Sequence, residues 1–273
     1  MTGETVESFQ QIVVDIRPLI QETIGRPHKL TVENRLLLTY FWLKKYPDIV
    51  ELSAMFDING NSVSRQLQRM VDILWTYFQG CIFWLTNDQW QQLRGGWEGI
   101  PNAVGAIDGT VHTIEMPEED THLFYSGHAH RYCISTQIII DNRRSIRYVH
   151  SGFLGHSTDA RQYRLIAPVG PERQLSLPDD CYILADKIYP NEKPLLMAWK
   201  VNELGAGLQQ DRRRLFNIEH AHHRIHVEHV IRTVKEYRIL QGRFRHPREQ
   251  LTKVVDLCTC LANRHVSFIQ EIR

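Results

Sequence analysis

The stretch Asn102-Ala103-Val104-Gly105-Ala106-Ile107-Asp108-Gly109-Thr110 is the one around which the rest of the chain is organised. Its apolar residues 104–107 predict a buried strand, with Asp108 at or near the end of that strand. Gly109 then lets the chain turn, or lets another group approach the backbone closely. Taken alone, Asp108 is a turn or capping residue, the favoured interpretation, or an inward-pointing functional acid. Two further acids decide between these interpretations.

Composition places the chain among ordinary globular proteins. It has 273 residues, of which 42% are hydrophobic and 23% charged, with a formal net charge of +1. This length suits one large domain or two modest ones, and a net charge near zero neither supports nor excludes nucleic acid. Five scattered cysteines predict no disulfide framework and a reducing compartment. The apolar run 36–43 is too short to cross a bilayer, so we expect no membrane partner.

The first part of the chain, residues 1–98, predicts an all-helical region. Helical spacing runs through residues 5–25, and Thr31 caps a further helix that Pro47 ends. A connector rich in Trp and Gln follows, with one short helix at about residues 88–93. The remaining residues, 99–273, have a different character and predict a second domain.

A helix-turn-helix pattern lies inside the helical region, at about residues 31–78. A short helix over 48–56 and a small turn precede a helix over 61–74 that begins with polar residues. The polar face of this last helix presents Arg65 and Arg69, which suit contacts to DNA phosphates and base edges. A plain helical bundle with a solvated polar face explains the same pattern equally well.

Beyond Asp108 the sequence becomes strand-like before it turns helical again. The predicted strands are residues 132–141, 145–153 and 181–186, with a hairpin turn at 142–144. The last of them ends in Asp186, as the first ends in Asp108. Between them, residues 155–164 predict a turn that opens a helix. Asp159 in this segment is either an acid at a helix N-terminus or an accessory acid of a site.

Two strands that each end in an aspartate bring Asp108 and Asp186 side by side if the strands are neighbours in one sheet. Two carboxylates at close range repel each other, and they tolerate one another when a divalent cation lies between them. Hard oxygen ligands with open water positions suit Mg²⁺ or Mn²⁺. The pattern therefore favours a metal site on the sheet.

The third acid comes from a long helix predicted over residues 218–240, which a final helix over 248–268 follows. Glu228 shares one helical face with three cations, Arg224, Arg232 and Lys235. A surface row of ion pairs is one interpretation. The functional one is a metal ligand flanked by phosphate-binding cations. Such parts suit two-metal phosphoryl transfer, in which one ion activates an attacking water or 3′-hydroxyl and the other stabilises the leaving oxygen.

The same helix is rich in histidine. His222, His226 and His229 follow one face at i, i+4 and i+7, with His220 and His223 nearby. Imidazoles with this spacing can bind zinc. The favoured expectation is instead that these side chains face solvent or DNA phosphate.

In their order along the chain, these motifs resemble those of the DDE transposases of the PIF/Harbinger (IS5-like) superfamily. The segments 107–110, 155–160, 184–190 and 227–240 are similar to the first-acid, glycine-rich, second-acid and third-acid motifs. The spacings, 186 − 108 = 78 and 228 − 186 = 42, fit the family. Departures include Thr158 where the family often has His, and Ala185 where it has Gly. They leave open an active transposase or a host-retained derivative.

The resemblance implies an RNase H-like mixed sheet with flanking helices, an α/β or α+β fold, behind the helix-turn-helix region. It implies a metal-dependent DNA endonuclease or transposase, a hydrolase acting on ester bonds. In such an enzyme Asp108, Asp186 and Glu228 bind two Mg²⁺ or Mn²⁺ ions, and Asp159 is an accessory acid. The alternative is a non-catalytic DNA-binding or adaptor protein retained from a transposase.

The resemblance also implies partners and a location. Double-stranded DNA is the expected substrate, and members of the family typically work with a Myb-like DNA-binding protein. The expected location is the nucleus in a eukaryote and the cytoplasm otherwise. Whether the chain forms a homodimer stays open at this point.

Overall fold

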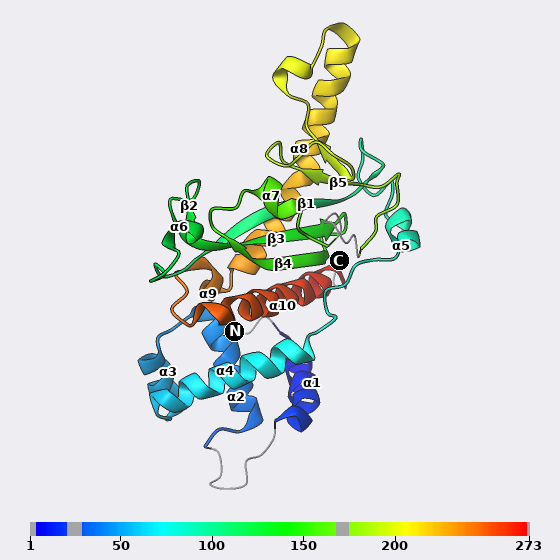
Figure 1. The fold of residues 1–273 in the computed structure, drawn as a ribbon. Coiled ribbons are helices and arrows are strands. Elements are labelled where there is room, and N and C mark those ends of the chain that lie inside the picture. Colours follow the sequence, from blue (N-terminus) through cyan, green and yellow to red (C-terminus); the bar gives the residue numbers. More distant parts are fainter. Residues whose placement is uncertain (1–3, 21–28, 168–174, 272–273) are drawn as a thin grey trace. The chain divides into compact units, whose positions relative to one another are not determined.

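The computed structural model describes residues 4–20, 29–167 and 175–271, with the side chains described as far as residue 265. The chain divides into two compact units, one made of residues 82–233 and the other of residues 1–81 with 234–273. Figure 1 shows the sheet of the first unit and the helices of the second. No helix in the described ranges is long and apolar enough to cross a membrane.

A six-stranded mixed sheet forms the centre of the unit 82–233. Its strands are β1 (Ala103–Thr113), β2 (Tyr125–Ser126), β3 (Arg131–Asp141), β4 (Ile146–Leu154), β5 (Tyr182–Ala185) and β6 (Leu195–Met197). The order is β2-β3-β1-β5-β6, and β4 pairs with β3. β3 lies antiparallel to β1 and β4, whereas β5 lies parallel to β1 and β6. This arrangement confirms the predicted mixed sheet with flanking helices.

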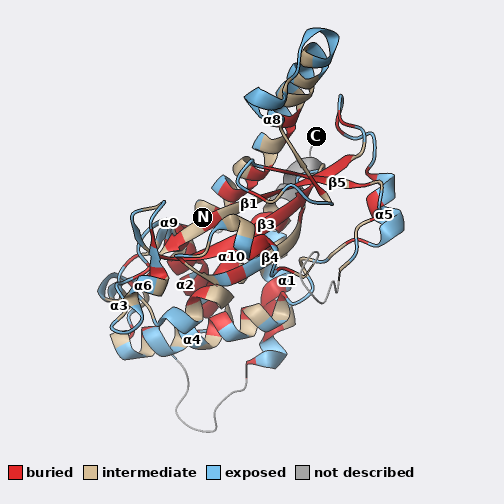
Figure 2. Cartoon of the chain, turned by 45° about the horizontal axis from the view of Figure 1, so that its top comes forward, coloured by how far each residue is buried: buried red, intermediate tan, exposed pale blue. Residues whose placement is uncertain are grey.

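Apolar side chains from strands and helices form the core of this unit. The helices are α5 (Asn87–Gln92), α6 (Thr121–Phe124), α7 (Asp159–Tyr163), the 3₁₀ turn η2 (Val201–Glu203) and α8 (Gly207–Lys235), whose last two residues fall in the other unit. Trp90 of α5 and Tyr163 of α7 pack with Ile107, Ile139 and Ile183 of the sheet, each at most 2% exposed. Burying a side chain of this kind contributes about 1.5–3 kcal/mol, so these two helices are held on the sheet. Figure 2 shows that much of the central strands is buried.

The other unit is helical. It contains α1 (Val6–Ile16), η1 (Arg17–Leu19), α2 (Val32–Lys45), α3 (Ile49–Phe56), α4 (Gly60–Tyr77), α9 (Arg238–Gln241), η3 (Arg248–Gln250) and α10 (Leu251–Glu271). Thr31 caps α2, since its hydroxyl accepts the N–H of Asn34 at 3.3 Å. The apolar stripe of α4 is buried and packs against α2, α3 and α10, while Arg65 stays exposed and Arg69 half-buried.

Two elements differ from their sequence prediction. β1 does not end at Asp108 but continues to Thr113, because β3 pairs with it along its length and places Ile138 opposite Asp108. The predicted helix over 218–240 begins earlier, at Gly207, and ends at Lys235. Tyr237 has extended backbone angles, φ −71° and ψ 102°, and separates α8 from α9.

Candidate active site

Parallel pairing of β1 with β5 relates the segments that carry the two aspartates. The last pair of this ladder is Ala106 with Leu184. Each aspartate lies two residues beyond its member of that pair, Asp108 within β1 and Asp186 just after β5. Each carboxylate accepts the N–H of the residue that follows it, from Gly109 at 2.9 Å and from Lys187 at 2.6 Å. Asp108 is half-buried within its strand, whereas Asp186 is exposed just beyond the end of β5.

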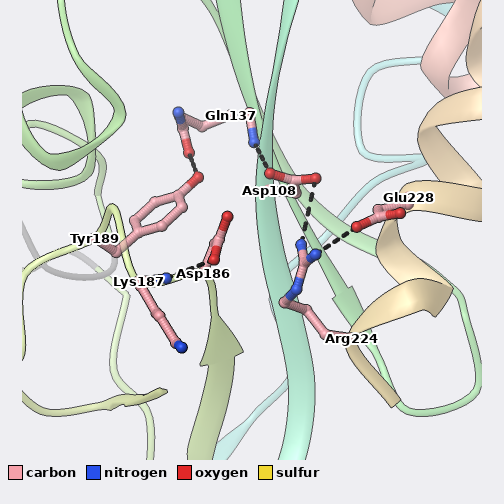
Figure 3. Close-up of polar contacts among 8 residues, drawn as sticks. Asp108, Gln137, Asp186, Lys187, Tyr189, Arg224 and Glu228 are labelled. Atoms are coloured by element: carbon pink, nitrogen blue, oxygen red, sulfur yellow. Dashed lines mark hydrogen bonds and ion pairs between the residues drawn. The ribbon is translucent and has the colours of Figure 1, made fainter. Parts of the chain in front are cut away.

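Helix α8 contributes Glu228 and links it to the sheet through Arg224. The guanidinium of Arg224 lies 2.5 Å from a carboxylate oxygen of Glu228, one turn away on the same helix. It also lies 3.8 Å from a carboxylate oxygen of Asp108. Figure 3 shows Arg224 between these two acids, with Asp186 on the other side of β1 in this view. An arginine side chain thus supplies the positive charge that the two acids share.

Asp159 approaches the site at Gly109. A Cβ atom at Gly109 would lie 2.4 Å from an oxygen of Asp159, so only a glycine leaves room for this carboxylate. The buried amide of Gln137 donates to the same oxygen at 2.9 Å. Gly109 therefore permits the close approach that the sequence suggested, and the chain does not turn there.

A buried hydrogen-bond network orients Asp159. Besides Asp159, the amide nitrogen of Gln137 donates to the side-chain oxygen of Gln162 at 2.9 Å. Its carbonyl oxygen accepts the hydroxyl of Tyr189 at 2.7 Å. Both polar ends of a side chain that is 0% exposed are thereby satisfied. Sequence reasoning missed Gln137, although a glutamine inside a β-branched, otherwise apolar strand is a signal for such a network.

The electrostatics of the site reflect crowded acids. Burial raises the pKa of Asp108 to about 6, the Gly109 N–H and Arg224 act in the opposite direction, and the charges of Asp159 and Glu228 add to the rise. Burial likewise raises the pKa of Asp159; Gln137 opposes this, and the charge of Asp186 adds to it. The acids are therefore close enough to sense one another, and a cation among them relieves the repulsion.

The residues fit a hard divalent cation by their chemistry, because the donors are carboxylate oxygens. Among the described side chains, Asp108, Asp186 and Glu228 do not have ligand atoms that all lie within 4.8 Å of one another. Between Asp108 and Glu228 the Arg224 guanidinium takes the place that a shared cation would need. A cation held by both acids would therefore replace this contact.

The other predicted DNA-binding residues lie further along α8 and on α4. Arg232 is exposed on α8, one turn beyond Glu228, and Lys235 is half-buried at the end of that helix. Arg65 and Arg69 lie on α4, in the helical unit. Among the five predicted cations, Arg224 forms ion pairs with Asp108 and Glu228, both within the unit 82–233.

From the sequence we expect the histidines of α8 to face solvent or DNA phosphate. Two of them instead anchor the helix. His220 is buried and donates from Nε2 to the carbonyl of Leu196 at 3.0 Å. His223 is buried and donates from Nε2 to the carbonyl of Glu98 at 2.9 Å. Both lie on the side of α8 that packs against its own unit. His226 is half-buried, and burial lowers its pKa to about 4.

Comparison with known proteins agrees with this arrangement. Residues 107–263, more than half of the chain, match the DDE superfamily endonucleases. The probable transposase for insertion sequence element IS702 of Microchaete diplosiphon is 22% identical over 248 residues, which cover 90% of this chain and 86% of that protein. No solved structure matches. The chain therefore belongs to the DDE superfamily endonucleases, enzymes that use divalent metal ions and act on DNA.

Proposed function

We propose that this chain is a metal-dependent DNA endonuclease of the transposase type, from the PIF/Harbinger (IS5-like) branch, which cuts phosphodiester bonds. Asp108, Asp186 and Glu228 are its metal ligands and Asp159 is an accessory acid. The observation that supports the proposal is the parallel pairing of β1, which contains Asp108, with β5, which Asp186 directly follows. Glu228 is linked to Asp108 through their shared ion-pair partner Arg224.

The chain's own residues have distinct tasks in this mechanism. When bound, two Mg²⁺ or Mn²⁺ ions activate the attacking oxygen and stabilise the leaving one. Asp108 presents its carboxylate from the middle of a paired strand. Arg224 moves from the acids to the phosphate, whose two non-bridging oxygens it can bind in a bidentate manner. Gln137 holds Asp159 in place beside Gly109.

DNA binding beyond the scissile bond falls to cations elsewhere on the chain. Arg232 and Lys235 continue the α8 face past Glu228, and Arg65 and Arg69 line α4 of the helix-turn-helix pattern. Each cation–phosphate contact that is lost reduces the magnitude of the slope of log binding constant against log salt concentration by about 0.9. Removing both Arg65 and Arg69 should therefore lower the slope by about two, and an unchanged slope would remove this unit from the DNA-binding surface.

A nicking assay on supercoiled plasmid tests the proposal. Asp186 is exposed, so Asp186→Asn removes a proposed ligand without disturbing the core. We expect nicking in Mg²⁺ or Mn²⁺ to be lost, while Glu119→Gln, at an exposed acid of the same unit, retains it. Equal activity of Asp186→Asn and wild type would refute the assignment. DNA binding by a wild-type chain that neither nicks nor binds Mn²⁺ in calorimetry would indicate the adaptor alternative.

The remaining expectations rest on the family resemblance alone. They are a Myb-like DNA-binding partner, nuclear location in a eukaryote or cytoplasmic location otherwise, and a homodimer as one form of the chain. Co-purification with a Myb-like protein, and the mass of the purified chain in solution, are the measurements that decide the first and the last.

A further inference from the structure

A second group of metal-ligating side chains lies on α8, one turn before the residues of the acidic site. Glu219, His222 and His223 are spaced i, i+3 and i+4, so they share one face of the helix. Each offers one ligand atom, and these atoms all lie within 4.8 Å of one another. Two imidazoles and a carboxylate are the donors that Zn²⁺ prefers, whereas Mg²⁺ prefers oxygen alone.

His223 has the hydrogen-bond arrangement of a metal-binding histidine. Its Nε2–H donates to the carbonyl of Glu98 at 2.9 Å, so in the neutral ring Nδ1 carries the lone pair. The residue is only 7% exposed, and Nδ1 is buried without a hydrogen-bond partner among the described residues. Metal-binding histidines almost always donate their other N–H to a carbonyl or carboxylate, which fixes the tautomer. A buried nitrogen without a hydrogen-bond partner is unfavourable, and a bound ligand would satisfy it.

The surroundings of the three side chains are rigid. The ring of Trp97 stacks on His223 with centroids 5.1 Å apart and an interplanar angle of 10°, and His222 stacks on His223 at 5.0 Å. A Cβ atom at Gly99 would lie 2.6 Å from Glu219, so the backbone there packs tightly against this turn of the helix. Ligands held in this way lose little conformational entropy when an ion binds.

We propose that Glu219, His222 and His223 form a binding site for Zn²⁺, or for a divalent ion with the same preference for imidazole, separate from the acidic site. The ion fastens α8 at the point where the helix joins its own unit. Towards its N-terminus the helix presents exposed apolar side chains, Leu208, Leu215 and Ile218, and its first part extends beyond the sheet (Figure 1). The zinc site steadies this junction, and it does not depend on the proposed nuclease activity.

This set differs from the one that the spacing of the histidines suggested. His226 and His229 follow one face with His222. The ring centroids of His226 and His229 lie 6.4 Å apart, and the centroid of His226 lies 6.1 Å from that of Trp97. Glu219, which sequence reasoning did not consider, replaces them. The third ligand comes from the preceding turn because His223, rather than His226, is fixed by the Glu98 carbonyl.

Zinc titration of the chelator-treated full chain, followed by calorimetry in saturating Mg²⁺, tests the site. The Mg²⁺ occupies oxygen sites and leaves imidazole sites open. We expect one Zn²⁺ per chain. His222 is exposed, so His222→Ala should leave the fold intact while it weakens this binding at least about tenfold, the effect of losing even an outer-shell partner. His229→Ala is the matched control on the same helix and should bind as the wild type does.

Two further variants separate this proposal from the nuclease assignment. Asp186→Asn should retain the Zn²⁺ affinity although it loses nicking, and His222→Ala should retain nicking in Mg²⁺. A Co²⁺ complex should show a visible absorption band that disappears in His222→Ala. Zinc binding that survives in His222→Ala, or that is lost in Asp186→Asn, overturns the proposal, and so does an absence of Zn²⁺ binding to the wild type.

Discussion

Helix α8 carries two consecutive turns that are held by different forces. The turn with Glu219 and His223 is fixed by a hydrogen bond to the backbone carbonyl of Glu98 and by ring stacking on Trp97. The next turn, with Arg224 and Glu228, is held by opposite charges across to Asp108. Neutral contacts fix a geometry whatever the ions in solution, whereas a charge network rearranges when a competing cation or anion arrives. The first turn can therefore serve as an anchor and the second as a site that responds to substrate.

The largest contrast between the turns should come from Asp108→Asn. We expect nicking to fall about a thousandfold or more, because a metal ligand supplies several kcal/mol of transition-state stabilisation. Zinc affinity at the first turn should not change. A plasmid assay and a zinc titration on the same preparation check both halves. A loss of zinc binding would mean that the two turns do not act independently.

The same substitution should also stabilise the fold. In the folded chain the pKa of Asp108 is raised from 3.8 to about 6, so ionisation of this group above pH 6 costs up to about 3 kcal/mol. This cost is absent near pH 4, appears as the pH rises towards 6 and is complete above it. Urea unfolding in chelator should therefore show Asp108→Asn gaining over wild type at pH 7 and losing that gain near pH 4. Glu119→Gln is the control, with a change within about 0.5 kcal/mol.

Next in size is the effect of Gly109→Ala. The added Cβ meets an oxygen of Asp159 at 2.4 Å and the amide nitrogen of Gln137 at 3.0 Å, so we expect a loss of about 1–3 kcal/mol in the free energy of unfolding. Gly127→Ala, where a Cβ meets nothing within 4 Å, should be nearly neutral. Adding Asp159→Ala should restore part of the lost stability. If it restores none, the strain does not arise from the carboxylate.

An effect of similar size is expected for Gln137→Met. The change keeps the length of the side chain but leaves the Tyr189 hydroxyl and Asp159 without their partner, at a cost of about 1–3 kcal/mol for the buried hydroxyl. Exposed Gln91→Met is the control. Thermal unfolding of both variants measures the difference, and equal melting temperatures would show that the network does not stabilise the fold.

The smallest effect should come from Arg224→Gln. Its side chain and those of Asp108 and Glu228 are 22–39% exposed, and such ion pairs contribute about 0.2–1 kcal/mol. Mn²⁺ should therefore bind at most about fivefold more tightly once the competing guanidinium is gone, while nicking falls because a phosphate contact is lost. Arg232→Gln should leave Mn²⁺ affinity unchanged. Weaker Mn²⁺ binding in Arg224→Gln would show that the arginine arranges the acids rather than competing for them.

Much of the fold was predictable because its signals are local. β-Branched runs located β3 and β4, and an apolar stripe located α4 and the middle of α8. The continuation of β1 through residues 109–113 was not predictable. A glycine and alternating polar residues give no clear strand signal there, and the strand is evident only from its pairing with β3. β6 has three residues, too few to show a period.

The candidate site was likewise only partly predictable from the sequence. Two apolar runs that each lead into an aspartate predicted neighbouring strands, and β1 and β5 are indeed neighbours in the sheet. That Asp108 and Asp186 form one site stays a prediction. The ion pairs of Arg224 and the Gln137 network depend on contacts between elements 22 to 116 residues apart, as 159 − 137 and 224 − 108 show, and no spacing rule encodes them. The helical row around Glu228 predicted a flanking cation, and only the structure shows that Arg224 reaches the sheet.

The placement of the two aspartates has a mechanical consequence. Asp108 belongs to a strand whose neighbours on both sides, β3 and β5, are bonded to it near that position. Asp186 follows the last residue of β5 and begins a turn. The carboxylate of Asp108 is thus carried by a strand paired on both sides, whereas that of Asp186 is carried by a turn. In the proposed mechanism, we expect Asp186 to adjust its position as the reacting oxygens move, while Asp108 stays fixed.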